Sequence, residues 1–127
     1  MRRFVLPLLL LLNTIVSGKT FYVATNGKDT NNGTSLATPF ATWQRGINAA
    51  YPGDTVFVRG GVYYLVGNNP FVEVNPQRWP VGQGRTGTKD KPICFWAYPQ
   101  DYESGNHPIL DCSQAYETYG TNFSCFG

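Results

Sequence analysis

The sequence predicts a mainly β fold that winds short strands around a core, and three observations support that prediction. Turn-forming residues recur at short intervals between apolar runs, with 14 glycines and 9 prolines in 127 residues, which favours many short strands over long helices. Two apolar runs, residues 92–99 and 108–111, each open with a proline and are joined by a polar loop, as successive strands would be. Aromatic residues make up 15% of the chain, enough to build a core.

The first 18 residues predict a secretory signal peptide. A short basic start precedes an apolar run over residues 4–12, and small residues lie three and one positions before a cut ahead of Lys19. A membrane anchor is disfavoured because a spanning helix needs about 20 apolar residues, and no cysteine near the cut supports a lipid anchor. We therefore expect residues 1–18 to be removed and the mature protein to be extracellular or periplasmic, with no membrane segment. A winding fold needs more turns than this chain supplies, so we expect residues 19–127 to form one incomplete, truncated domain.

Removal of this leader balances the charge. The chain has ten Lys and Arg residues against eight Asp and Glu residues, and loss of Arg2 and Arg3 leaves eight of each sign. The mature net charge is then zero, without the basic surface that nucleic-acid binding requires. We expect no nucleic-acid partner.

The mature chain opens with a predicted strand over residues 21–24, followed by an Asn, Gly, Asp and Thr-rich loop over residues 25–35. Asp29, Asn31 and Asn32 carry oxygen atoms that calcium accepts as ligands. The loop lacks the carboxylate spacing and distal glutamate of a helix-loop-helix calcium site. Side chains that bond their own turn are the favoured interpretation.

One helix is expected, over residues 40–50. Thr38 is the predicted N-cap, with Pro39 at the first helical position. The apolar stripe recurs at spacings of three, four and three residues, which is typical of one buried helix face, and consists of Phe40, Trp43, Ile47 and Ala50. Arg45 and Asn48 are expected on the opposite, solvated face.

Further strands are expected along the rest of the chain. They are separated by turn residues and comprise residues 55–58, 62–65, 71–74, 93–97 and 109–110. Arg59, Gly60 and Gly61 predict a tight corner, because glycine permits positive φ and close backbone approach. A phosphate-binding loop is excluded, since no G-x-x-x-x-G-K-[ST] frame surrounds the glycines.

A long polar segment, residues 75–91, interrupts the strands. Arg78, Trp79 and Arg85 suggest a sugar-binding surface, with an aromatic face for stacking and guanidinium groups for carboxylates. The alternative, which we favour, is a loop held down by its one tryptophan.

The cysteines and the single histidine predict no metal site. Cys94, Cys112 and Cys125 have spacings that match no zinc pattern, and His107 has no histidine partner. An odd number of cysteines leaves one unpaired. Either one thiol is free and buried in the β core, which we favour, or its partner lies in sequence beyond this chain.

The order of these segments resembles the N-terminal region of secreted right-handed parallel β-helix proteins. The resemblance is nearest to the family 9 polysaccharide lyases, which are pectate lyases, and to their uncharacterised β-helix relatives. The first matching block holds the strand, its loop, the helix and the glycine corner, and comprises residues 21–24, 26–27, 32–35, 38–40, 43, 49–56 and 59–63. A second block resembles the first complete coil of that group, and comprises residues 87–93, 97–99 and 108–111.

The resemblance implies the start of a right-handed parallel β-helix of the pectin lyase-like class, with a capping helix at its N-terminal end. Each coil of such a fold buries its apolar face only against its neighbours, so about three or more coils are needed for stability. The capping helix is expected to cover the strand edge at the N-terminal end, because unpaired backbone groups there invite association.

The resemblance also implies chemistry, which we assign to no residue of this chain. Lyases of this family cleave a uronate polymer by β-elimination, in which a lysine base removes the proton α to the carboxyl group and calcium held by carboxylates stabilises the developing charge. No block matched here contains those motifs. Lys89 and Lys91 lie in a polar loop beside Asp90, where protonated, solvated lysines are expected. The predicted catalytic, cofactor-binding and metal residues are therefore none.

A hydrolase would use a pair of carboxylates as acid and base, and the nearest candidates are Asp101, Glu103 and Asp111. Their separation, which decides such a mechanism, is not set by the sequence. Structural or solvated roles are favoured. His107 precedes a proline in a turn, so a nucleophilic triad has no support.

The resulting hypothesis is the N-terminal part of a secreted, calcium-dependent lyase that acts on pectate or a related polyuronate. This chain by itself is expected to be inactive, with an acidic polysaccharide as the partner of a monomeric full-length protein. Two alternatives are a non-catalytic carbohydrate-binding or surface β-helix protein and a β-helix glycoside hydrolase.

Overall fold

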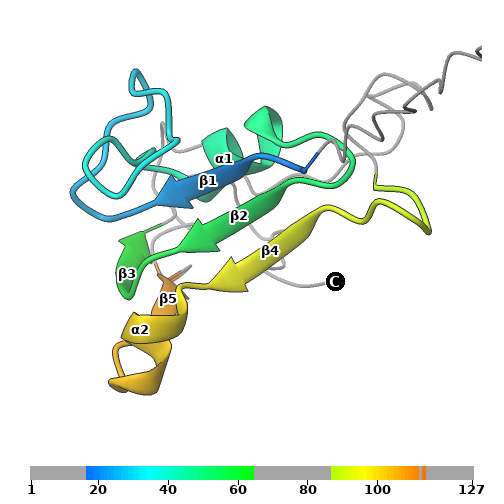
Figure 1. Cartoon of the computed structure of the whole chain (residues 1–127). Helices are drawn as coiled ribbons and strands as arrows, with labels where there is room; N and C mark the ends of the chain where they lie inside the picture. The colour runs from blue at the N-terminus through cyan, green and yellow to red at the C-terminus, as the bar shows by residue number, and fades with distance from the viewer. Residues whose placement is uncertain (1–16, 65–86, 112, 114–127) are drawn as a thin grey trace, which may run out of the picture.

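Two parallel sheets form the framework of the protein, whose computed structural model describes residues 17–64, 87–111 and 113 (Figure 1). The first sheet has the order β1-β2-β4, from Thr20–Val23, Thr55–Val58 and Cys94–Ala97. The second sheet pairs β3 (Gly61–Tyr64) with β5 (Pro108–Asp111). All three pairings are parallel, which confirms the predicted mainly β, winding architecture.

The predicted strands agree with the observed ones to within one or two residues at each end. Gly61 adopts φ +132° at the start of β3, so the expected glycine corner is confirmed. Residues 71–74 and most of the polar segment, with Arg78, Trp79 and Arg85, lie outside the described residues, as do Cys112 and Cys125. Cys94 is free and half-buried on β4; the prediction that one of the three thiols is free and buried also concerns Cys112 and Cys125, outside the described residues.

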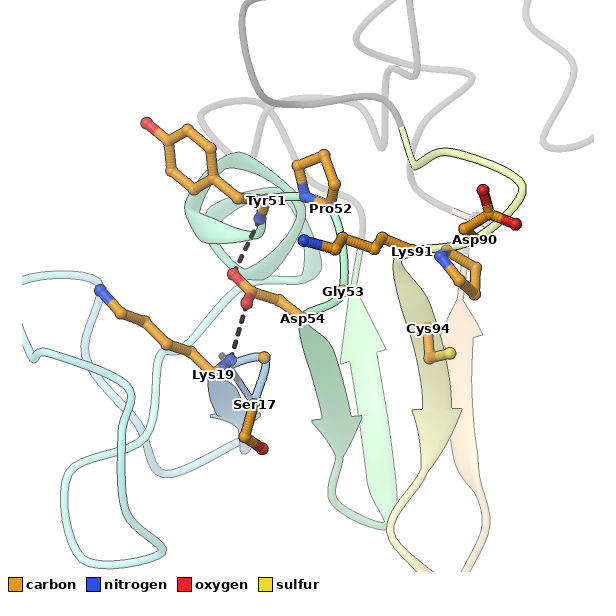
Figure 2. Close-up of a pocket in the computed structure, with 11 residues that line it drawn as sticks. Ser17, Lys19, Tyr51, Pro52, Gly53, Asp54, Asp90, Lys91 and Cys94 are labelled. Carbon is orange, nitrogen blue, oxygen red and sulfur yellow. Dashed lines mark hydrogen bonds between the residues drawn. The ribbon is translucent and has the colours of Figure 1, made fainter. Parts of the chain in front are cut away.

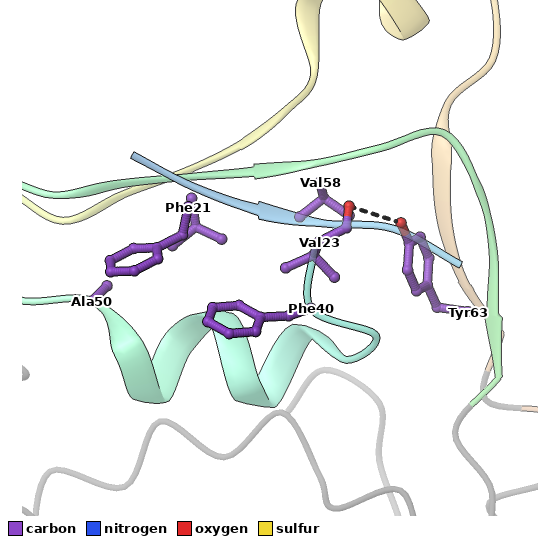
Figure 3. Packing of buried hydrophobic residues seen from close by; sticks show 7 residues of the cluster. Phe21, Val23, Phe40, Ala50, Val58 and Tyr63 are labelled. Atoms are coloured by element: carbon purple, nitrogen blue, oxygen red, sulfur yellow. Dashed lines mark hydrogen bonds between the residues drawn. The ribbon is translucent and has the colours of Figure 1, made fainter. Parts of the chain in front are cut away.

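The core lies on one face of the first sheet, because alternate residues of a strand point to the same side. Phe21 and Val23 of β1 and Val56 and Val58 of β2 are all buried there. Figure 3 shows these strands packed over α1, and Phe40 belongs to the same buried cluster. Burial of this face is the main apolar contribution to the fold.

Tyr63 closes the core at the corner between the two sheets. Its hydroxyl donates to the carbonyl of Arg59 at 2.8 Å and lies 3.3 Å from the carbonyl of Val23 (Figure 3). Burial raises the pKa of Tyr63, so this phenol stays protonated and remains a donor. One side chain thus joins β1 to the β2–β3 corner.

The helix α1 spans Trp43–Ala49 and begins later than predicted. Thr42 is the N-cap, and its side chain accepts a hydrogen bond from the backbone N–H of Arg45. The expected cap, Thr38, instead donates its hydroxyl to Asn32. The predicted start was wrong because Phe40 pairs with β1 in an extended bridge and is not available to the helix.

The predicted stripe is confirmed in part, since Phe40 and Ala50 are buried and Trp43 packs against the core. Within the helix the buried residues are Gln44 and Gly46, while Trp43 and Ile47 are half-buried. Arg45 is not simply solvated, since its guanidinium lies 4.6 Å from the ring centroid of Phe40. Gly46 lies at the centre of the contact between α1 and the first sheet, and its lack of a side chain allows the helix to approach the sheet closely.

Gly46→Ala is expected to destabilise the protein by about 1–2 kcal/mol. A Cβ at this position would lie 2.9 Å from a methyl carbon of Val23 and 2.9 Å from one of Val56, and overpacking costs about 1–3 kcal/mol against a gain of up to about 1 from helix propensity. Chemical denaturation measures the loss. Val56→Ala should destabilise by itself, yet the double variant should lose less than the sum; strictly additive losses would show that this contact is not tight.

The free edge of β1 is covered by the loop that follows it, not by α1. Tyr22 donates its N–H to Gly33 and accepts from Phe40, and Ala24 donates to Phe40. The helix packs on the face of the sheet instead. Our prediction that the helix covers this edge was wrong. The N–H and C=O groups at a strand edge pair with an extended segment, whereas those of a helix are already bonded within the helix.

The loop after β1 is held by its own side chains. Asp29 accepts from the N–H groups of Ala41 and Thr42 and from the Thr42 hydroxyl, at 2.7–3.0 Å. Asn31 donates to Pro39, and Asn32 accepts from Thr34 and Thr38. The bond of Asn32 to Thr34 confirms turn chemistry for that residue, whereas Asp29 and Asn31 bond residues 8 to 13 positions away and hold the end of the loop to its start.

A short second helix, α2 (Pro99–Glu103), connects β4 to β5 and was not predicted. Pro99 occupies its first turn and Asp101 lies at its N-terminal end, both favourable positions. Five residues are too few to show a helical period, which explains why the pattern did not reveal it. Within the described residues, no helix is long and apolar enough to cross a membrane.

Candidate functional site

The outer face of the first sheet carries a row of aromatic side chains. Strand register places Tyr22 of β1 opposite Phe57 of β2, and Phe57 opposite Trp96 of β4. Since alternate residues fill the core, these three point to the other side. We call Tyr22, Phe57 and Trp96 the aromatic row.

The aromatic row is ordered by ring contacts and is open at one end. The rings of Tyr22 and Phe57 are stacked at 6.1 Å, and Tyr98, directly after β4, meets both edge-on at 6.1 and 5.9 Å. Trp96 is 60% exposed, the highest exposure among the large apolar side chains of the described core and sheets. Exposed aromatic patches of this kind often mark ligand-binding surfaces.

An ion pair fixes the position of Tyr98 beside this row. The guanidinium of Arg59 lies 5.0 Å from the Tyr98 ring centroid and binds Asp101 through Nε and through Nη2 at 3.0 Å. Asp101 also accepts the N–H of Gly60 at 2.9 Å. The pair links the corner after β2 to the corner after β4.

The electrostatics of this pair make it structural. Hydrogen bonding from Arg59 lowers the pKa of Asp101, with a further contribution from the Gly60 N–H, and the same bond raises the pKa of Arg59. Both groups therefore stay ionised at neutral pH. Because Asp101 already neutralises it, Arg59 is a poor candidate for binding a substrate carboxylate.

The other carboxylates and basic residues singled out from the sequence do not converge. Lys89, Asp90 and Lys91 lie in an exposed turn closed by bonds between Thr88 and Lys91. Hydrogen bonds from Ser113 lower the pKa of Asp111, and His107 stacks on Tyr102 at 4.5 Å. No group of three or more His, Cys, Asp or Glu residues in the described part of the chain is placed to hold a metal.

A second feature is an open cavity of about 480 Å³ where the strands of the first sheet begin (Figure 2). Its lining includes Lys19, Tyr51, Asp54, Lys91 and Cys94. Asp54 is the one buried carboxylate among these residues. The cavity lies at the opposite end of the strands from the Arg59–Asp101 pair.

The aromatic row was missed from the sequence, although its members occupy interior positions of three predicted strands. Segments of 31 and 35 residues, which include α1 and β3, separate the strands in sequence, so their register is not evident from spacing. The available signal was the recurrence of an aromatic residue next to a core position in each strand, namely Tyr22, Phe57 and Trp96.

Parallel strands stacked in register on two sheets define a β-helix, and comparison with known proteins agrees. The family model described as "Pel9A-like, right handed beta helix region" matches residues 21–126. The chain belongs to this Pel9A-like β-helix family, as its resemblance to family 9 lyases predicted.

Among solved structures, a rhamnogalacturonan lyase matches at 28% identity with a TM-score of 0.59. The match covers 76% of this chain and 22% of that lyase, so the chain spans less than a quarter of this relative. This likeness relates the partial β-helix to polysaccharide lyases.

Two other structures match less well. XylC in complex with xylose shares 26% identity over 61% of this chain and 10% of its own, with a TM-score of 0.38. A GH136 lacto-N-biosidase from Eubacterium ramulus shares 24% identity over 63% and 11%, with a TM-score of 0.44. These two similarities are too low to carry an inference. No curated protein matches the sequence.

Proposed function

We propose that this chain is the N-terminal part of a secreted polysaccharide lyase that acts on pectate or a related polyuronate. The match of the Pel9A-like model to residues 21–126 is the observation that carries the proposal. The likeness to a rhamnogalacturonan lyase supports a polymer that contains uronate residues. The aromatic row supplies a surface on which sugar rings can lie.

The reaction we propose is β-elimination. A base removes the proton α to the uronate carboxyl group, the bond to the leaving glycosidic oxygen breaks, and a double bond forms in the new terminal sugar. Calcium is the cation expected from the family resemblance, but the described residues hold no fitting carboxylate cluster. We therefore assign neither the base nor a metal ligand to these residues.

The part proposed for this chain is binding. Tyr22 and Phe57 stack on each other and are held by Tyr98, and Trp96, the next residue along the row, exposes its ring to solvent. Apolar faces of sugar rings bury area against such rings, while their hydroxyls stay in water. The row crosses three strands, so it offers contacts to successive sugars.

The test is turnover by the full-length gene product. The protein is incubated with calcium and a panel of polygalacturonate, rhamnogalacturonan and neutral xylan, and ultraviolet absorbance follows the unsaturated product. We expect product from at least one uronate polymer, none from xylan, and loss of activity with a chelator. Absence of unsaturated product from every uronate polymer would overturn the proposal.

A second candidate function is carbohydrate binding without catalysis. It is favoured by an assembled aromatic row in a region whose described residues include no group of three or more His, Cys, Asp or Glu placed to hold a metal. Saturable binding of a uronate polymer without any product would select this candidate. Calcium-dependent turnover would exclude it.

Trp96→Ala is expected to weaken polysaccharide binding by about 3- to 10-fold, because an aromatic contact contributes about 0.5–1.5 kcal/mol beyond its buried area. The folded protein should lose little stability, since Trp96 is largely exposed. Affinity electrophoresis or calorimetry measures binding. Tyr51→Ala removes another exposed aromatic ring, which lies outside the row in the turn before β2, and should leave affinity unchanged; an equal loss in both variants would contradict a specific role for Trp96.

A further inference from the structure

A buried carboxylate receives the backbone nitrogen of the first residue of the expected mature chain. Asp54 is only 5% exposed, and its Oδ1 accepts the N–H of Lys19 at 2.7 Å. Its Oδ2 accepts the N–H of Tyr51 at 2.9 Å (Figure 2). The two carboxylate oxygens thus tie the start of β1 to the turn before β2.

The position of that nitrogen is set by the sheet and not by the leader. Lys19 accepts the N–H of Thr55 at 2.9 Å as the first rung of the β1–β2 ladder. Gly18 lies against the Gly53 carbonyl, so close that a Cβ would come within 1.7 Å of its oxygen. The β1–β2 ladder therefore places the Lys19 nitrogen beside Asp54, while the Gly18 contact exists only as long as residues 17 and 18 are attached.

The leader boundary drawn from the sequence falls at this same nitrogen. Small residues at positions three and one before Lys19 suit a leader peptidase. An amide nitrogen gives Asp54 one neutral donor, whereas a free amino terminus gives a positive charge and three donors. A buried carboxylate is stabilised far more by the free amino terminus, because the carboxylate charge is then paired as well as hydrogen-bonded.

We propose that cleavage between Gly18 and Lys19 creates an α-ammonium group that forms a partly buried ion pair with Asp54. A leader peptidase catalyses hydrolysis: water breaks the peptide bond, leaving a carboxylate on Gly18 and an amino group on Lys19, which is protonated at neutral pH. The ion pair then locks the first strand into the sheet after export. This inference does not depend on the proposed enzymatic function.

The ion pair predicts a characteristic dependence on pH. A free α-amino group has an ordinary pKa of about 7.7–8.0, and pairing with a carboxylate raises it in the folded state. Its contribution is therefore fully present below about pH 8 and is lost as the pH rises through the folded value. The charged and titratable groups around the cavity are the Lys19 side chain, Tyr51, Asp90, Lys91 and Cys94, and they are common to every variant compared.

The experiment begins with the secreted full-length protein, whose N-terminus is read by intact mass and Edman sequencing. We expect it to begin at Lys19. The same protein is then prepared with Ser17 and Gly18 retained, and thermal midpoints of both lengths are measured at about pH 6 and about pH 10. We expect the Lys19-start form to melt several degrees higher at the lower pH, and the difference to shrink at the higher pH.

Asp54→Asn is then introduced into the Lys19-start protein and into the protein that retains Ser17 and Gly18. The difference in thermal midpoint between these two proteins should then vanish. An N-terminus elsewhere, equal midpoints of both lengths at both pH values, or an equal loss in both lengths on Asp54→Asn would overturn the proposal. If Asp54→Asn does not fold, the pH dependence of the length difference decides alone. A pH-independent difference would then count against the ion pair.

Discussion

Phe40→Ala is expected to destabilise the full-length protein by about 3–5 kcal/mol, the usual cost of removing a buried phenylalanine. The Phe40 side chain is 1% exposed and stacks on Phe21 with ring centroids 5.9 Å apart. Gly33 leaves space for its ring, since a Cβ there would come within 2.3 Å of it. Loss of the ring leaves a cavity in the core cluster and also removes the ring on which the Arg45 guanidinium lies.

Chemical denaturation of the full-length protein measures this loss. Leu36→Ala is the matched control, because Leu36 lies in the same loop but is exposed, and its replacement should change stability by less than about 0.5 kcal/mol. Similar losses for the two variants would show that Phe40 is not a core residue. Phe40→Leu should fall between them, since it retains much of the buried area.

Asp101→Asn is expected to cost about 1–3 kcal/mol, the range for a lost charged hydrogen bond. The lower half of that range applies, because the side chain of Arg59 is 34% exposed and solvent screens the pair. The variant weakens the bonds to Arg59 and Gly60 together. Glu103→Gln, an exposed carboxylate on the same helix, should have little effect.

The same pair predicts how stability responds to acid. The pKa of Asp101 is lowered in the folded state, so its contribution is present above the unfolded value of about 4 and is lost as the pH falls through the folded value. Denaturation at several pH values should show a smaller acid-induced loss in Asp101→Asn than in the parent. Parallel curves would contradict a stabilising role for the ionised carboxylate.

The sequence predicted the strands well because apolar residues and turn residues report directly on which short segments are buried. In β2 the apolar run Val56 to Val58 after Thr55 predicts the strand, whereas its core face, with Val56 and Val58 buried, is set by the structure. The helix α1 was predicted, but its predicted start was too early in the sequence. Thr38 and Pro39 satisfy the local rules for a cap, yet pairing of Phe40 with β1 is a tertiary contact that no local rule contains.

The candidate site was less predictable, because it depends on register between distant strands. Each member of the aromatic row is unremarkable within its own strand. Only the pairing of Tyr22 with Phe57 and of Phe57 with Trp96, which lie far apart in the sequence, assembles the surface. The role of Asp101 was anticipated only as structural or solvated; its partner Arg59 lies 42 residues away in the sequence.

The two corners that Arg59 and Asp101 join differ greatly in length. Two residues, Arg59 and Gly60, connect β2 to β3, whereas residues 98–107, including α2, connect β4 to β5. Despite this, β4 remains in register with β2 and β5 with β3. Chain length at this corner is therefore uncoupled from strand pairing, which makes it a permissive point for insertions: an engineered loop or a short recognition peptide placed after α2 would project from the coil without disturbing the alignment of the strands on either side.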